Sequence, residues 1–193
     1  MFIQFLKENR YVSLLLTVLR IYLGWEWLNA GWGKISSRNF DASGFMAGAV
    51  KNISGEHPVV QPWWGNFLKE VAIPYVDLFN VLVPWGEFLV GAALILGVFT
   101  SFSVLMGLTM NFAYMFSGTT STNPQMVLLG MFILVAGLNA GKIGVDRWII
   151  PVLRKWIFKK TVNKQFPQGA RAGKSKLITN MKKDITIQTQ FSN

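Results

Sequence analysis

The chain has 193 residues, of which 51% are hydrophobic and only 15% charged, and its mean hydropathy is +0.35. Soluble domains usually carry about 25% charged residues, so this composition is that of a membrane protein rather than of a soluble domain. The sequence has no cysteine and one histidine, His57, which excludes disulfides, thiol chemistry, cysteine-held iron–sulfur clusters and a bis-histidine haem within one subunit.

Four apolar stretches stand out as candidate membrane spans, at about 12–32, 81–100, 102–116 and 124–141. None shows the alternation of a barrel strand, so each is expected to be a helix. The sequence therefore predicts an all-α fold in which residues 1–160 form one four-helix transmembrane bundle. The first span holds Arg20 and Glu26, and no small-residue cleavage site follows it, so we expect it to be retained rather than cleaved as a signal peptide.

The largest connection is the loop 35–80 between the first two spans, which is too long to be a simple turn. We expect this loop to lie on the outer side of the membrane. Its aromatic residues suit a belt or cap at the outer interface: Trp63, Trp64, Phe67, Tyr75 and Phe79. A structural lid is the favoured interpretation, and a lid that admits substrate is the alternative.

Positive charge is concentrated at the C-terminal end of the chain. Twelve of the nineteen basic residues lie at or after Lys142, and only Asp146 and Asp184 oppose them there. The positive-inside rule then predicts a multi-pass protein of the cell membrane with both termini in the cytoplasm. Residues 146–160 are expected to form an interfacial helix on an anionic leaflet, and 161–193 a basic, flexible cytoplasmic tail. These charges are attributed to the membrane surface, and no nucleic acid is expected as a partner.

Polar residues inside the predicted spans are the strongest functional signal. Glu87 is the lone charge of the second span, and a carboxylate at a helix centre costs roughly 2.5–3.5 kcal/mol on insertion scales. If the first span ends near Trp32 and the second begins near Val81, a rise of about 1.5 Å per residue places Glu26 and Glu87 roughly 9 Å below the outer surface. We expect a polar layer there, formed by Glu26, Asn29, Glu87 and Asn111, with Lys34 or Arg20 able to reach it.

Two neighbouring carboxylates cannot both ionise cheaply, so either one is protonated or a cation lies between them. We therefore predict Glu87 and Glu26 as proton-handling catalytic residues, with a substrate-binding set of Arg20, Asn29, Lys34 and Asn111. A purely structural ion pair is the alternative. Four glycines are predicted to allow close helix packing: Gly24, Gly31, Gly91 and Gly97. The sequence holds no P-loop, dinucleotide fingerprint, nucleophile elbow or metal-ligand cluster, so no metal is expected.

These motifs together resemble the DoxX/DoxD-like membrane protein family, and more closely its DoxD branch, the small subunit of thiosulfate:quinone oxidoreductase. The segments that carry the resemblance are 20–24, 30–34, 87–97 with Thr100, 110–118 with the following Asn123-Pro124, and 141–147. The long loop before the second span also fits that branch. Positions carried over from the motifs are Arg20, Lys34, Glu87, Asn111 and Asp146, the last as a structural motif residue.

The resemblance implies an integral membrane subunit of a quinone-linked redox system that works beside a second redox subunit. No covalently bound cofactor is expected, and a membrane quinone is the implied co-substrate. The lipid bilayer is the expected environment, and assembly into a homo-oligomer is left open. Whether the chain is itself an enzyme is also left open; the activity implied is that of a thiosulfate dehydrogenase (quinone)-type subunit. A small-molecule transporter and a non-catalytic scaffold that recruits a soluble oxidoreductase are the competing functions.

Overall fold

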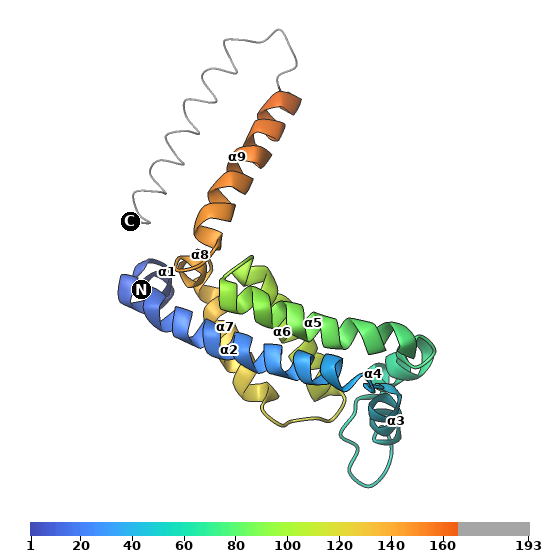
Figure 1. Ribbon diagram of the computed structural model, residues 1–193. Coiled ribbons are helices and arrows are strands. Elements are labelled where there is room, and N and C mark those ends of the chain that lie inside the picture. The colour runs from blue at the N-terminus through green and yellow to red at the C-terminus, as the bar shows by residue number, and fades with distance from the viewer. Residues whose placement is uncertain (166–193) are drawn as a thin grey trace.

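The computed structural model describes residues 1–165, and every regular element within them is a helix (Figure 1). This confirms the all-α prediction. The predicted tail lies outside the described residues apart from its first five, which belong to the last helix. The elements in chain order are α1 (Phe2–Glu8), α2 (Arg10–Ser37), α3 (Ser43–Lys51), α4 (Pro62–Phe67), the π-helix η1 (Leu68–Ala72), α5 (Val76–Leu96), α6 (Thr100–Phe116), α7 (Asn123–Ala136), α8 (Leu138–Gly141) and α9 (Asp146–Gln165).

The helices α2 and α5 lie side by side and antiparallel, and they form the longest pairing in the molecule (Figure 1). Gly24 lies against Gly91 and Ile95, whereas Gly31 lies against the backbone of Phe88. Without side chains at these glycines, the two backbones approach closely enough for van der Waals packing to hold the pair together. The close contact fixes the register of α2 against α5.

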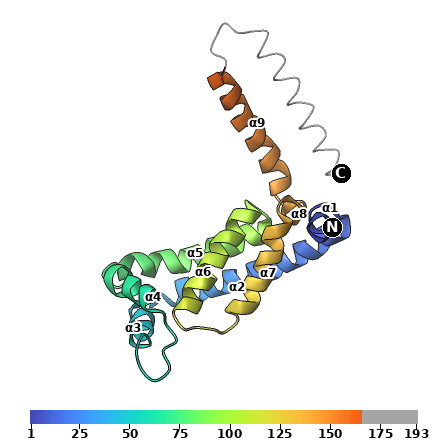
Figure 2. The same cartoon turned by 180° about the vertical axis from the view of Figure 1, so that it is seen from behind.

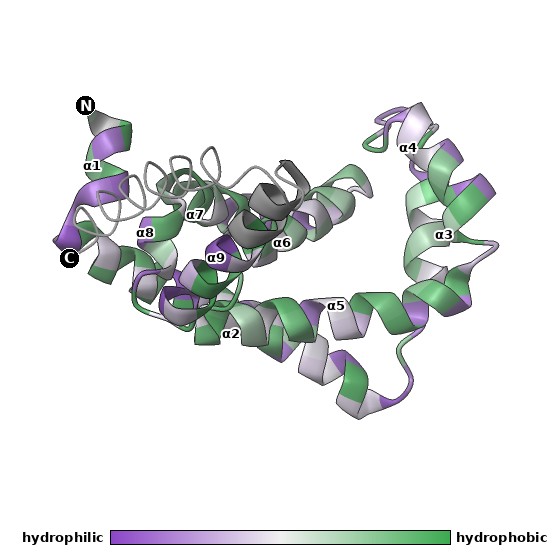
Figure 3. Cartoon of the chain, turned by 90° about the horizontal axis from the view of Figure 1, so that it is seen from above, coloured by the Kyte–Doolittle hydropathy of each residue, from purple (hydrophilic) through white to green (hydrophobic). Residues whose placement is uncertain are grey.

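The helices α6 and α7 pack on this pair and on each other, and the view from behind shows them on the other side of α2 and α5 (Figure 2). We call α2, α5, α6 and α7 the helical body. Its interior is apolar and includes the buried side chains of Leu16, Leu23, Trp27, Leu94 and Ile133. Many large apolar side chains also face outward from α2 and α5, and a lipid environment accounts for such a surface better than water does. Strongly hydrophilic residues gather toward the two ends of the body (Figure 3).

Among the described helices, α5 is long and apolar enough to span a membrane, and α7 is apolar but shorter. The helix ends differ from the predicted spans. The second span was expected at 81–100, but α5 begins at Val76 and ends at Leu96, because Gly97 adopts a left-handed conformation that terminates the helix. The first span was expected to end near Trp32, yet α2 continues to Ser37.

Residues 38–75 form a compact cap at one end of the body, which we call the lid. It contains α3, α4 and η1 and has its own small core: Ala42, Met46, Ala49, Val60, Leu68 and Ala72. Side-chain hydrogen bonds are among the contacts that attach it to the body. The Asn80 Oδ1 atom accepts a hydrogen bond from the Ala42 amide at 2.8 Å, and Trp64 Nε1 donates to Ser117 Oγ at 2.9 Å.

The lid also contains a carboxylate that stabilises the start of α3. Asp41 accepts hydrogen bonds from the Ser43 hydroxyl at 2.6 Å and from the Ser43 amide at 2.9 Å. These bonds, with a longer one from Asn80, hold the pKa of Asp41 below its usual value. At the other end of the body, α9 points away from it (Figure 1).

Candidate functional site

Glu87 lies inside the body near the lid and is held by two donors from two other helices. Its side chain is 1% exposed. The Lys34 ammonium of α2 donates to Glu87 Oε2 at 2.6 Å, and the Tyr114 hydroxyl of α6 donates to Oε1 at 2.5 Å. Both carboxylate oxygens therefore have a short, charge-compatible partner. We call Lys34, Glu87 and Tyr114 the polar triad.

The backbone of α5 near Glu87 is shaped by Pro84. Proline lacks an amide hydrogen, so Pro84 cannot donate the usual α-helical hydrogen bond to the carbonyl of Asn80, four residues earlier. The carbonyl of Pro84 faces Gly31 across the α2–α5 contact. Glu87 follows one turn later on α5. Lys34 lies one turn beyond Gly31 in the opposite direction, since the helices are antiparallel, and its long side chain points back along α2 to reach the carboxylate.

Aromatic side chains of the lid cover the triad. The Phe45 ring of α3 packs edge-on against the Tyr114 ring, with 6.0 Å between the ring centroids. The Lys34 ammonium lies 5.7 Å from the centroid of the Phe40 ring. Lys34 keeps 28% of its side chain exposed, whereas Glu87 is almost fully enclosed. The carboxylate of the triad is therefore buried, and its Lys34 partner is the partly exposed member at the lid end of the molecule.

The predicted polar layer is only partly assembled. The structure brings Lys34 to Glu87, but Glu26 is not its neighbour, because Glu87 is level with Gly31, five residues away from Glu26 along α2. Five residues correspond to roughly 7–8 Å along a helix. The equal-depth estimate failed because it assumed that α2 ends and α5 begins at the same level, whereas the contacts at Gly24 and Gly31 set a staggered register of the two helices. Glu26 is half-buried and Asn29 exposed, and within residues 1–157 neither forms a side-chain hydrogen bond.

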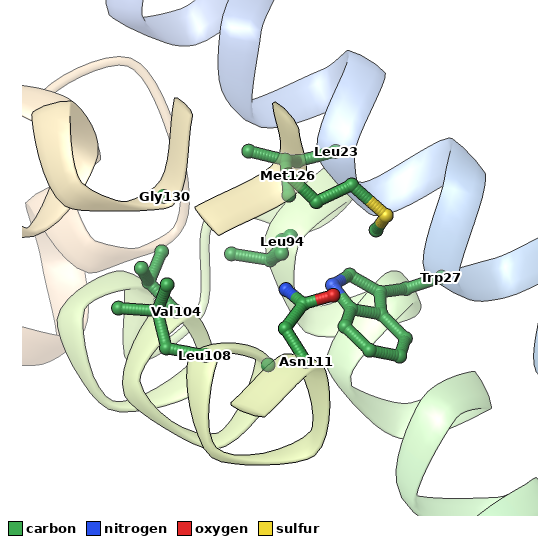
Figure 4. A pocket seen from close by; sticks show the side chains of 9 residues that line it. Leu23, Trp27, Leu94, Val104, Leu108, Asn111, Met126 and Gly130 are labelled. Carbon is green, nitrogen blue, oxygen red and sulfur yellow. The ribbon is translucent and has the colours of Figure 1, made fainter. Parts of the chain in front are cut away.

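Asn111 lies one turn below Tyr114 on α6, and its amide is 1% exposed. Figure 4 shows this amide pointing into a gap between Trp27, Leu94 and Met126. Neither its nitrogen nor its oxygen has a hydrogen-bond partner among the described residues. Asn111 therefore belongs to the same region as the triad but is not bonded to it.

Arg20 lies at the opposite end of the body, far from the triad. Its guanidinium is 2% exposed and donates to the carbonyls of Ile143 at 2.7 Å and of Ala140 at 3.3 Å. The backbones of Gly97 and Gly144 pack against it, and side chains at either position would collide with it. The structure thus places Arg20 where it joins α2 to the segment after α8, and not in the predicted polar layer.

Asp146 is the second buried charge at this end, with 3% of its side chain exposed. Its carboxylate accepts hydrogen bonds from the amides of Phe99 at 2.6 Å and Thr100 at 2.8 Å, where α6 begins. Phe99 has a φ of 45°, a left-handed conformation that is strained in a phenylalanine. The two bonds hold that conformation, and the carboxylate sits at the positive end of the helix dipole.

Sequence reasoning missed Tyr114 as a functional residue. Tyrosine is common at both membrane interfaces, so its presence near the end of an apolar helix is not a distinguishing signal. The spacing from Asn111, three residues along the same helix, places both polar groups on one face. That spacing was the available clue.

A buried carboxylate with a lysine and a tyrosine on its two oxygens can accept, hold and pass a proton, and it can exchange a partner for the polar group of a ligand. No group of three histidine, cysteine or acidic side chains that could hold a metal occurs in residues 1–157. The triad is thus suited chemically to proton handling or to the recognition of a polar group.

A family model for DoxX matches residues 15–120, more than half of the chain. The chain belongs to the DoxX family. The matched region includes all three triad residues and Asn111, whereas Asp146 lies beyond it. DoxX is a membrane-associated family linked to quinone-related redox subunits, in agreement with the apolar outer faces described above. No curated protein and no solved structure matches the chain.

Proposed function

We propose that this DoxX-family chain is an integral membrane subunit of a quinone-linked redox system. The observation that carries the proposal is the triad: a carboxylate that is 1% exposed, bonded on both oxygens and covered by the lid. Ionisable groups at membrane depth are expensive, and they usually mark proton or substrate pathways. A quinone takes up protons as it is reduced, so a subunit serving it needs such a group near the membrane.

In this proposal each triad residue has its own role. Glu87 accepts and releases the proton, Tyr114 orients the carboxylate and links it to the interior of the body, and Lys34 supplies the neighbouring positive charge. The partly exposed Lys34 connects Glu87 with the lid end. Electrons come from a second subunit, because this chain has no cysteine to hold a sulfur intermediate or an iron–sulfur cluster. Thiosulfate is the proposed electron donor of the complete system, as the DoxD-like motifs suggest.

The experiment is thiosulfate-dependent reduction of decyl-ubiquinone in membranes that contain the chain with its co-purifying proteins. General acid–base groups contribute about 100-fold or more to rate, so Glu87→Gln should lower the turnover by at least that factor. Glu26→Gln is the matched control, because it removes a half-buried carboxylate of α2 that lies away from the triad. We expect it to retain turnover within about two-fold. Equal losses in both variants, or no quinone reduction by the wild type, would reject the proposal.

The proposed membrane arrangement has four spans, formed by α2, α5, α6 and α7 with α8, and both termini in the cytoplasm. The lid then lies on the outer side and α9 on the inner leaflet. The apolar outer faces of α2 and α5 support this arrangement, as does the basic composition of α9.

A scaffold that recruits a soluble oxidoreductase is the second candidate, and the position of α9 favours it. This helix points away from the body and exposes Trp148 and Val152 beside basic residues (Figure 1). A chain ending after Lys160 keeps most of α9 and removes the tail, and a chain ending after Ile149 removes both while keeping Asp146. If the scaffold role holds, one of these truncations abolishes co-purification of the oxidoreductase while the body stays folded.

A further inference from the structure

Asn111 and Asn139 are both buried asparagines, yet their amides differ completely in their partners. The Asn139 amide nitrogen donates to the carbonyls of Leu6 at 2.8 Å and Asn9 at 3.1 Å. The Asn111 amide is bonded at neither end within the described chain. Buried polar groups are almost always paired, and an unpaired one is destabilising. The burial of the Asn139 amide is thus explained by its hydrogen bonds, whereas that of the Asn111 amide is not.

The gap that the Asn111 amide faces has apolar walls drawn from all four helices of the body (Figure 4). Leu23 and Trp27 come from α2, Leu94 from α5, and Met126 from α7. No charged residue lines it, and the space is too narrow for a water molecule. Water therefore does not satisfy the amide in this conformation.

The side chains that line the gap can move, however. Met126 is unbranched and flexible, and methionine side chains adapt readily to irregular spaces. Gly107 and Gly130 also line the gap, so two of its sides are bare backbone. A change of rotamer at Met126 would open room beside the amide without moving a helix.

We propose that this gap is the closed form of a binding pocket for a small, uncharged ring that carries a hydroxyl or carbonyl group. The uncharged apolar walls select an uncharged ligand, and the flat indole of Trp27 suits a ring. The amide donates from Nδ2 and accepts at Oδ1, so it pairs with a hydroxyl in both directions and with a carbonyl in one. The pocket deepens the proposed function and rests on it for its natural ligand, because quinols and quinones are rings of this class.

The test is calorimetric titration of the detergent-solubilised full chain with phenol and with toluene, after subtraction of empty micelles. The two rings have nearly the same shape, and only phenol carries the hydroxyl. The wild type should bind phenol about ten-fold more tightly than toluene, as one additional hydrogen bond predicts. Asn111→Leu should abolish this preference. Equal affinity for the two rings in the wild type, or no binding of either, would overturn the proposal.

Thermal unfolding without ligand gives a second, independent readout. Asn111→Leu replaces an unpaired amide by an apolar group of similar branching, so its melting temperature should equal or exceed that of the wild type. Asn139→Leu, the matched control, should melt at a lower temperature because it removes two hydrogen bonds to backbone carbonyls. A fall for Asn111→Leu as large as that for Asn139→Leu would show that Asn111 is a structural residue and would reject the pocket.

Met126→Ala keeps the test decisive if Asn111→Leu does not fold. This variant enlarges the space beside the amide, so phenol should bind more tightly than to the wild type and raise the melting temperature more. Binding is measured without turnover, so the two proposals fail separately. Selective phenol binding without quinone reduction rejects the redox function alone, and quinone reduction without selective binding rejects the pocket alone.

Discussion

Glu87 shows how one carboxylate can be tolerated inside an apolar helical body. Burying an ion is expensive, and attraction to a partner offsets that cost only where geometry is good and further hydrogen bonds satisfy the remaining lone pairs. Both conditions hold here, since Lys34 and Tyr114 each bind one oxygen. The burial of Glu87 is therefore compensated only while both Lys34 and Tyr114 stay bonded to it.

This compensation predicts that removing Lys34 alone destabilises the protein more than removing both charges of the pair. Lys34→Met leaves the Glu87 carboxylate buried without its counter-charge, and breaking a buried pair in this way costs about 3 kcal/mol or more. The double variant Lys34→Met/Glu87→Gln removes both charges, so it should regain most of that loss. Equilibrium unfolding in detergent measures both values. A double variant no more stable than Lys34→Met would contradict the triad as described.

The sequence was enough to single out Glu87, because an isolated charge in an apolar run is visible without any structure. It was not enough to choose its partner. Lys34 and Arg20 were both candidates, and the register of α2 against α5, set by contacts at Gly24 and Gly31, places Lys34 next to Glu87. Such a register depends on backbone approach between two distant segments, which hydropathy does not encode.

The pairing of α2 with α5 is the element-scale feature on which the site depends. A side chain at Gly31 or Gly91 would collide with the backbone of the partner helix, which cannot move aside as a side chain can. Gly33, only two residues from Gly31, has open space around the same position. Gly31 and Gly33 therefore form a natural comparison within α2.

Gly31→Ala should separate the two helices and weaken the triad, with a destabilisation of about 1–3 kcal/mol as for other overpacked sites. Gly33→Ala should be neutral or stabilising by about 0.5–1 kcal/mol, because alanine is the better helix former. Thermal unfolding of both variants checks the difference. If the two alanines have the same effect, the close α2–α5 contact is wrong.

Helix identity was predictable, and helix ends were not. The apolar runs indicate helices directly, but α5 ends at Leu96 because Gly97 and Phe99 turn the chain in left-handed conformations. Phe99 gives no sequence signal of such a turn. Its conformation is held by Asp146, a residue 47 positions away, whose role here is a contact in space.

At the scale of the whole molecule, the two ends of the helical body differ in construction. The lid end is covered by aromatic side chains and holds the triad, whereas the opposite end is closed by Arg20 and Asp146 through backbone groups. In the proposed membrane arrangement, the triad lies near one membrane surface, and Arg20 and Asp146 lie near the other. The membrane arrangement proposed above has the lid facing outward.

The absence of cysteine makes this orientation directly testable. Glu56→Cys places a single thiol on the lid, and Lys7→Cys places one on α1, both at exposed positions. A membrane-impermeant thiol reagent applied to intact cells should label the Glu56→Cys variant and spare the Lys7→Cys variant. Both should react after the membrane is opened. The reverse pattern in intact cells would invert the topology, and labelling of both would reject the spanning arrangement.

Asp146 also sets an order of events during synthesis. Three earlier groups donate hydrogen bonds to acceptors in residues 140–146: the amides of Phe99 and Thr100 and the guanidinium of Arg20. A ribosome therefore releases α2, α5 and α6 before the groups that complete their common end exist. The pairing of α2 with α5 can form early, but that end closes only when the segment after α8 arrives. A nascent chain that stops before residue 140 lacks the two carbonyls to which the Arg20 guanidinium donates.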